Sequence, residues 1–175
     1  MMKEVVLGNG LRVLIRPQML EDANGLWALY SSLSRTTRTL SGIPEPLDEQ
    51  EFYERMTDLL RNACQHRYIC AVRSPKERFI GYFGVETPEN PETGWMFFFV
   101  QDDYQGQGLG KEILAYTIEE APLLGLKRLK CQVWVENKRA ISLFRRYGFK
   151  VEKEWSDPES GKLSYTMSRA ISSPL

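Results

Sequence analysis

Short apolar runs and helix-spaced apolar positions alternate along the chain, with turn residues between them. Near the start, the apolar residues 5–7 and the mostly apolar segment 11–15 flank Gly8-Asn9-Gly10. Asn-Gly tolerates the positive φ of a tight turn, so this segment predicts a β-hairpin whose second arm ends at Pro17. The next elements, by apolar spacing, are helices over residues 20–33 and 48–64, then strands over residues 68–72 and 79–85.

The second half of the chain predicts four more strands and two more helices. A continuous apolar run over residues 94–100 is typical of a buried central strand. Pro122 is expected to end or bend the long helix after this strand, and Gly148 to stop the last helix in a left-handed conformation. The remaining elements, in chain order, are a helix over residues 106–124, a strand over 129–135, a helix over 137–147, and strands over 149–155 and 163–168.

These elements together predict an α+β fold built around one mixed sheet, with residues 1–175 forming a single domain. Asp48 is the expected cap of the second helix. Residues 34–47 carry glycine and prolines and are predicted to be a mobile loop that borders a binding site, because long loops beside a rigid scaffold often carry specificity.

Composition narrows the class of protein and of partner. Hydrophobic residues make up 42% of the chain, enough for a globular core, and Lys plus Arg equal Asp plus Glu at 23 each. The balanced charge predicts no nucleic-acid partner and no anionic membrane partner. Three irregularly spaced cysteines and a single histidine, His66, predict neither a disulfide framework nor a metal site. Without a long apolar segment or a signal peptide, we expect a cytoplasmic protein.

The most informative segment is the glycine-rich turn between the buried strand and the long helix. Backbone N–H groups in such a turn, together with the N-terminus of the following helix, form an anion site suited to a pyrophosphate. A Rossmann fingerprint fails because Leu109 and Ile113 stand where its third glycine is required, and a P-loop fails because Glu112 follows Lys111. Three alternating glycines at this junction favour a ligand site over a turn without a ligand.

The segment Gln105-x-x-Gly108-x-Gly110 resembles the Q/R-x-x-G-x-G/A signature of GNAT acetyltransferases, which cradles the pyrophosphate of acetyl-CoA. About 30 residues later, Asn137, Ala140 and a helix that ends in Gly148-Phe149 are similar to the second half of the same family's pattern. The loop looks particularly like that of the bacterial protein-lysine acetyltransferase branch. The resemblance implies the GNAT (acyl-CoA N-acyltransferase) fold, a mixed and mostly antiparallel sheet of six to seven strands flanked by about four helices, with its core at about residues 12–169.

The resemblance also implies which residues bind acetyl-CoA. In the family, two strands splay apart and the pantetheine arm pairs with exposed backbone of the first one. Residues from the strand, the glycine loop and the last helix would then make the contacts: Phe98 and Val100 by their backbone, Gln105, Gly106, Gln107, Gly108, Leu109, Gly110 and Lys111 around the pyrophosphate, and Asn137, Ala140 and Phe144 on the other wall.

Two catalytic positions depart from the family pattern. Many relatives place an acidic Tyr four residues before the glycine that ends the last helix, where this chain has Phe144. Tyr147, one turn further on, is the alternative acid, or else a packed aromatic residue. The protein-lysine branch often has a Glu early in the central strand, where this chain has Trp95. Glu86, at the end of the preceding strand, is the candidate general base, or else a solvated carboxylate.

The sequence therefore favours an enzyme that transfers the acetyl group of acetyl-CoA to an amine acceptor by direct attack in a ternary complex. The acceptor would be a small molecule or a protein amine, and the enzyme a monomer or a homodimer without a metal. The alternative is a catalytically weak acyl-CoA-binding regulatory or sensor domain, which the residues at Phe144 and Trp95 favour. The intact glycine loop and Asn137 favour the enzyme.

Overall fold

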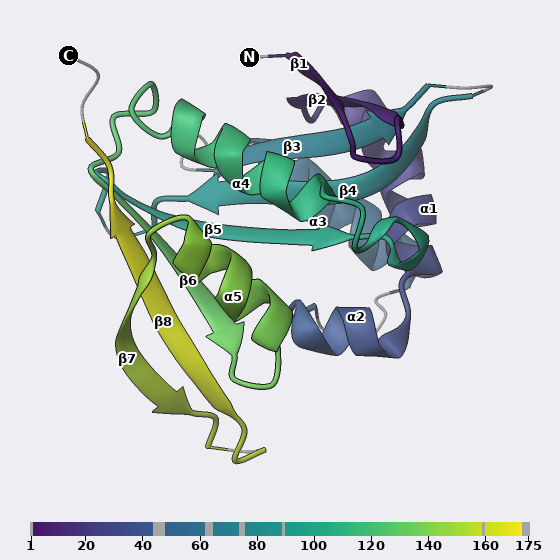
Figure 1. The fold of residues 1–175 in the computed structure, drawn as a ribbon. Helices are drawn as coiled ribbons and strands as arrows, with labels where there is room; N and C mark the ends of the chain where they lie inside the picture. The colour runs from purple at the N-terminus through teal and green to yellow at the C-terminus, as the bar shows by residue number, and fades with distance from the viewer. Residues whose placement is uncertain are drawn as a thin grey trace.

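The protein folds around one mixed β-sheet, whose strands are labelled in Figure 1. The computed structural model describes residues 2–43, 48–61, 65–73, 76–88, 90–158 and 160–172. Within these residues the sheet has eight strands in the order β1-β2-β3-β4-β5-β6-β8-β7, and all neighbouring pairs are antiparallel except β5 and β6. The strands are β1 (Lys3–Val6), β2 (Arg12–Pro17), β3 (Gln65–Val72), β4 (Arg78–Glu86), β5 (Thr93–Val100), β6 (Arg128–Trp134), β7 (Lys150–Ser156) and β8 (Leu163–Ala170).

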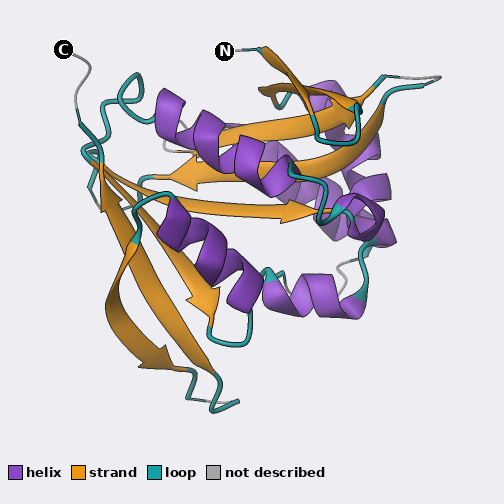
Figure 2. Cartoon of the chain, in the orientation of Figure 1, coloured by secondary structure: helices purple, strands orange, loops and turns teal. Residues whose placement is uncertain are grey.

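Helices cover both faces of this sheet, as Figure 2 shows. Helices α4 and α5 lie on one face, whereas α1 and α3 pack on the opposite face of the β3–β5 half. No helix in the described parts of the chain is long and apolar enough to cross a membrane. The helices are α1 (Ala23–Ser32), α2 (Arg35–Leu40), α3 (Glu49–Arg61), α4 (Leu109–Glu120) and α5 (Lys138–Arg146), with short 3-10 helices at Leu20–Asp22 and Asp102–Tyr104.

The sheet and helices confirm the predicted fold, with two differences. The described residues form eight strands rather than six to seven, and five α-helices rather than about four. The additional helix is α2, which replaces the first part of the predicted loop. The Ser34 side chain caps it by accepting a hydrogen bond from Thr37 N, and Gly42 ends it at a φ of 66°. Of that loop, residues 44–47 lie outside the described residues.

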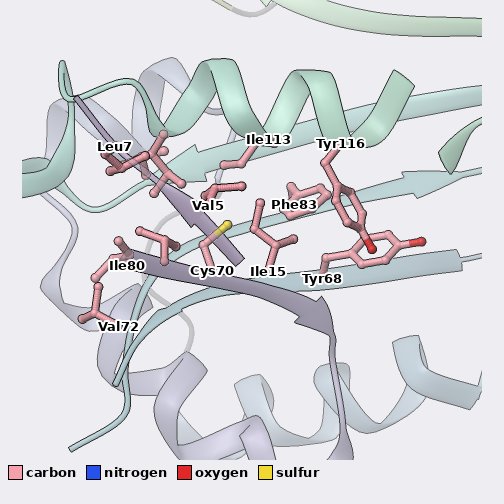
Figure 3. Packing of buried hydrophobic residues seen from close by; sticks show 13 residues of the cluster. Val5, Leu7, Ile15, Tyr68, Cys70, Val72, Ile80, Phe83, Ile113 and Tyr116 are labelled. Atoms are coloured by element: carbon pink, nitrogen blue, oxygen red, sulfur yellow. The ribbon is translucent and has the colours of Figure 1, made fainter. Parts of the chain in front are cut away.

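Helix α4 is held on the sheet by a buried aromatic and aliphatic cluster (Figure 3). Ile113 and Tyr116 point from α4 toward the sheet, where the Tyr116 ring meets the edges of Phe83 and Tyr68. The rings of Tyr68 and Phe83 stack on each other across β3 and β4 at 4.9 Å between centroids. This packing fixes the N-terminus of α4, and with it the preceding glycine loop, at the end of β5.

The junction of β5 and β6 opens part-way along the sheet. Their parallel pairing covers only Thr93–Arg128, Gly94–Leu129 and Trp95–Lys130, although both strands continue beyond these pairs. In Figure 1 the two strands diverge from this point toward the ends that carry their arrowheads. The splay predicted from the family resemblance is therefore present, and it lies beside the glycine loop.

Candidate active site

The glycine loop has the backbone conformation that an anion site requires. Gly106 and Gly108 adopt φ values of 81° and 101°, which residues with a side chain rarely adopt. Gly108 is the N-cap residue of α4, so the first N–H groups of the helix follow it directly. The loop therefore brings backbone donors and the positive end of a helix to the end of β5.

Arg139 supplies a cation to this loop that the sequence did not predict. A carbon added to Gly106 would lie 2.8 Å from a guanidinium nitrogen of Arg139, which places the end of this side chain beside the loop. Arg139 is exposed in the first turn of α5, a helix far from the loop in sequence. Gly110 lies against different neighbours, since a carbon added there would be in ordinary contact with Phe98 of β5 at 3.4 Å and with Leu143 of α5 at 3.5 Å.

The backbone of Phe98 and Val100 faces the opening between the strands. Gln101 N donates to Ile80 O on β4 at 2.9 Å, so the alternate residues of β5 direct their polar groups away from β4. The carbonyl of Val100 accepts a hydrogen bond from Gln105 Nε2 at 3.0 Å. The side chain of Gln105 therefore fixes the loop to the end of β5, and its backbone N–H donates to Asp102 O at 3.2 Å.

Other residues of the loop are also fixed by neighbours. Gln107 accepts a hydrogen bond from Asn9 Nδ2 at 2.6 Å and donates to Asp103 O at 2.7 Å, so the tip of the first hairpin holds the loop. The Leu109 side chain is 1% exposed and packs in the core, which leaves only its backbone for a ligand. Lys111 is exposed on the first turn of α4.

The N-terminal half of α5 forms the second wall. Asn137 caps this helix, its Oδ1 accepting a hydrogen bond from Ala140 N at 3.1 Å. Phe144 is buried against Phe98 and Phe149, with ring centroids 5.9 and 5.1 Å away. A phenyl ring has no proton to donate, so the position that many relatives give to an acid is here part of the core.

On the opposite face of the sheet from α4 and α5 lies a second feature, which we name the tryptophan hollow. It has a volume of about 440 Å³ and begins where β5 and β6 separate. Its described lining contains three tryptophans and two carboxylates but no lysine or arginine. The lining residues are Leu40, Ser41, Gly42, Glu86, Trp95, Met96, Phe97, Gln132, Trp134, Trp155 and Asp157.

Glu86, the predicted base, is held on the wall of this hollow by an ion pair with Arg67. Arg67 is almost fully buried, and its guanidinium lies over the Phe97 ring at 4.5 Å. Gly84 makes this stack possible, because a side chain there would come within 2.8 Å of Phe97 and 2.9 Å of Arg67. The ion pair engages Oε1 of Glu86, whose side chain is 39% exposed.

Tyr147, the predicted acid, lies elsewhere. It borders a separate hollow of about 740 Å³ with Arg128 and Lys150, at the end of β6 that is still paired with β5. Arg169 Nη1 donates to its backbone oxygen at 2.6 Å. The structure therefore places Glu86 on the wall of the tryptophan hollow and does not bring Tyr147 and Glu86 together.

The described cysteines are poor nucleophiles. Cys70 and Cys131 are both buried, and burial raises the pKa of the Cys70 thiol and that of Cys131, the latter to about 12. Because the thiolate is the reactive form, neither side chain is suited to carry an acetyl group at neutral pH. The third cysteine, Cys64, lies outside the described residues.

Comparisons with known proteins agree with this architecture. The GNAT domain of S. lividans PAT superposes with a TM-score of 0.78 at 20% identity, covering 97% of each chain. Spermidine N-acetyltransferase from Vibrio cholerae in complex with CoA and spermine superposes with a TM-score of 0.74 at 16% identity, covering 91% of this chain and 95% of that one. These likenesses define the fold as that of the GNAT N-acetyltransferases.

The sequence comparisons give the family. A model of the acetyltransferase (GNAT) domain family matches residues 12–150, and the chain therefore belongs to the GNAT acetyltransferases, as the resemblance predicted. Spermine/spermidine N(1)-acetyltransferase of Bacillus subtilis (strain 168) is 40% identical over 58 residues, which are 33% of this chain. That match spans 38% of the length of the Bacillus protein.

Proposed function

We propose that the protein transfers the acetyl group of acetyl-CoA to the amine of a small cationic acceptor. The observation that carries the proposal is the opening between β5 and β6, which has the glycine loop on one side and the tryptophan hollow on the other. Gly106, Gly108 and Arg139 suit the pyrophosphate, and the backbone of Phe98 and Val100 suits the pantetheine arm.

The chemistry of the tryptophan hollow supports a cationic acceptor. Asp157 adds a carboxylate to its described lining beside Glu86, which is ion-paired with Arg67. The faces of tryptophan rings attract ammonium groups, as the Lys130 ammonium shows at 5.7 Å from the Trp95 ring, and Trp134 and Trp155 offer further rings. A volume of about 440 Å³ lies in the range of small-molecule sites. Spermine and spermidine are named as substrates of two of the similar proteins, which makes polyamines the first acceptors to test.

The proposed reaction is a direct transfer in a ternary complex. An alkylammonium must first lose a proton, since its pKa is about 10.4, and Glu86 accepts this proton directly or through a water molecule. The amine nitrogen then bonds to the acetyl carbon while the carbon–sulfur bond breaks. Coenzyme A leaves as a thiolate, whose thiol has a pKa of about 8.5, so protonation by water suffices. The buried Cys70 and Cys131 support direct attack over an acetyl-cysteine intermediate.

The release of free thiol from acetyl-CoA tests this function. We expect the purified protein to release thiol when spermidine, spermine or another small diamine is present, and to release much less with a lysine-containing peptide. Mass spectrometry of the amine should show one added acetyl group. If CoA binds but no amine gives thiol release, the protein is the acyl-CoA sensor that the sequence leaves as the alternative, and the proposal fails.

The substitution Tyr147→Phe tests whether Tyr147 or water protonates the CoA thiolate as it leaves. Because Tyr147 borders a different hollow, at the end of β6 that is still paired with β5, we expect Tyr147→Phe to leave kcat and its pH profile within about twofold of the unaltered enzyme. General acid catalysis typically contributes about 10²–10⁴-fold. A loss of tenfold or more with unchanged affinity for acetyl-CoA would instead establish Tyr147 as the acid predicted from the sequence.

A further inference from the structure

Asp102 connects two segments that are far apart in sequence. It lies two residues after the end of β5, and its carboxylate accepts hydrogen bonds from Ser34 N at 2.9 Å, Ser34 Oγ at 2.6 Å and Thr37 Oγ1 at 2.7 Å. Partial burial raises the pKa of Asp102, but the hydrogen bonds from Ser34 and Thr37 outweigh it and hold the pKa below its ordinary value. The carboxylate is therefore ionised at neutral pH, and it fastens the first turn of α2.

Gln105 extends this connection to the glycine loop. Its Nε2 donates to Thr37 Oγ1 at 2.9 Å and to Val100 O at 3.0 Å. The Thr37 hydroxyl thus donates to Asp102 and accepts from Gln105, and the Thr37 side chain is buried. The end of β5, the loop expected to hold the pyrophosphate and the start of α2 form one hydrogen-bonded unit.

The other end of α2 reaches the tryptophan hollow. Leu40, Ser41 and Gly42 line it, and Ile43 N closes the helix on Arg38 O at 2.9 Å. A helix of six residues is far too short to be stable in water by itself, so its position depends on tertiary contacts. Any displacement of its first turn is therefore carried to the wall formed by Leu40–Gly42.

We propose that Asp102 is a positioning residue that couples the acetyl-CoA loop to the acceptor wall through α2. The inference rests on the proposed function, because it takes the loop as the acetyl-CoA site and the hollow as the acceptor site. CoA that orders the loop then also orders α2, and by reciprocity an acceptor that contacts the wall strengthens the binding of CoA. Asp102 touches neither substrate and acts through Ser34, Thr37 and Gln105.

Amide hydrogen exchange with CoA alone as the probe tests this coupling without any acceptor. In the unaltered protein, saturating CoA should slow exchange at the α2 amides by about fivefold or more, the low end of typical coupling. In Asp102→Asn one acceptor oxygen becomes a donor that faces Ser34, so the slowing should fall below about twofold while CoA still binds. The amides to follow are those of Arg38, Ser41, Gly42 and Ile43, which donate to backbone oxygens of α2 or of its N-cap Ser34.

Matched variants separate coupling from general damage. Asp103→Asn makes the same chemical change one residue along, on an exposed side chain without a contact to α2, and should keep the full CoA effect. Thr37→Val, which keeps shape but loses the hydroxyl, should lose the effect, whereas Thr37→Ser should retain it. If CoA binds and Asp102→Asn or Thr37→Val keeps the effect, Asp102 is not the coupling residue. If CoA does not bind to the unaltered protein, the proposed function fails instead.

Discussion

Gly108→Ala is expected to remove most of the thermal stabilisation that acetyl-CoA gives to the protein. A ligand at 100 times its dissociation constant stabilises the folded state by about 2.7 kcal/mol, which is roughly 5–10 °C for a chain of this size. Gly108 has a φ of 101°, and a side chain there would meet no protein atom within 4 Å. The added methyl group would therefore occupy open space at the N-terminus of α4, where the loop is proposed to bind the pyrophosphate.

The size of the effect follows from the contacts that would be lost. Two charge-assisted hydrogen bonds contribute about 1.5–3 kcal/mol each, so their loss weakens binding by about 100-fold or more. At the same ligand concentration, the melting temperature should then rise by only about 1 °C. Differential scanning fluorimetry with and without acetyl-CoA measures both shifts.

Gly125→Ala is the matched control for this prediction. Gly125 also has a positive φ, 75°, and a side chain there would likewise meet no atom within 4 Å, but it lies in the turn between α4 and β6. Both variants strain the backbone to a similar extent, and only Gly108→Ala should lose the response to acetyl-CoA. An equal and nearly full response in both would show that the loop does not bind the pyrophosphate.

Local sequence signals were enough to predict most elements of the fold. The Asn-Gly turn, the continuous apolar run over residues 94–100 and the caps at Asp48 and Gly148 act within a few residues of where they stand, and each is found where it was predicted. Pro122 follows the last residue of α4 closely, as expected. Such patterns specify turns, helices and strands because the interactions behind them join residues that are close in sequence.

Helix α2 escaped prediction because its stability is not local. Both ends carried a signal, Ser34 as an N-cap and Gly42 just beyond the helix, but the six residues of α2 include three threonines, which favour helix weakly. The helix is held instead by Asp102, whose position relative to Ser34 only the folded sheet provides.

The candidate site also contains features that the sequence predicted and features that only the fold reveals. The glycine loop and the cap at Asn137 are continuous motifs and could be located from the sequence. The tryptophan hollow could not, because Trp95, Trp134 and Trp155 come from three different strands. The sequence presented Trp95 as a missing Glu, whereas the structure gives it a place on the hollow's wall. Arg139 was missed for the same reason, since its contact with Gly106 spans two elements.

Glu86→Gln is expected to have the largest effect on catalysis. If Glu86 accepts the proton of the acceptor amine, its loss should lower kcat/KM for the acceptor by about 10²–10⁴-fold, the usual contribution of a general base. The affinity for acetyl-CoA should not change, because Glu86 lines the tryptophan hollow and not the glycine loop. Gln keeps an oxygen to accept from Arg67, so the buried guanidinium retains a partner and the fold should survive.

Asp157→Asn distinguishes proton transfer from electrostatic attraction. Asp157 is the other carboxylate of the hollow, so both variants remove one negative charge from its lining. We expect Asp157→Asn to raise the acceptor KM with little change in kcat, because it weakens attraction only. In Glu86→Gln, by contrast, kcat should fall and then recover as the pH rises toward the pKa of about 10.4, where the free amine needs no base. If the two variants lose only affinity, and by similar factors, Glu86 is an anchor for the ammonium group and bulk water takes the proton.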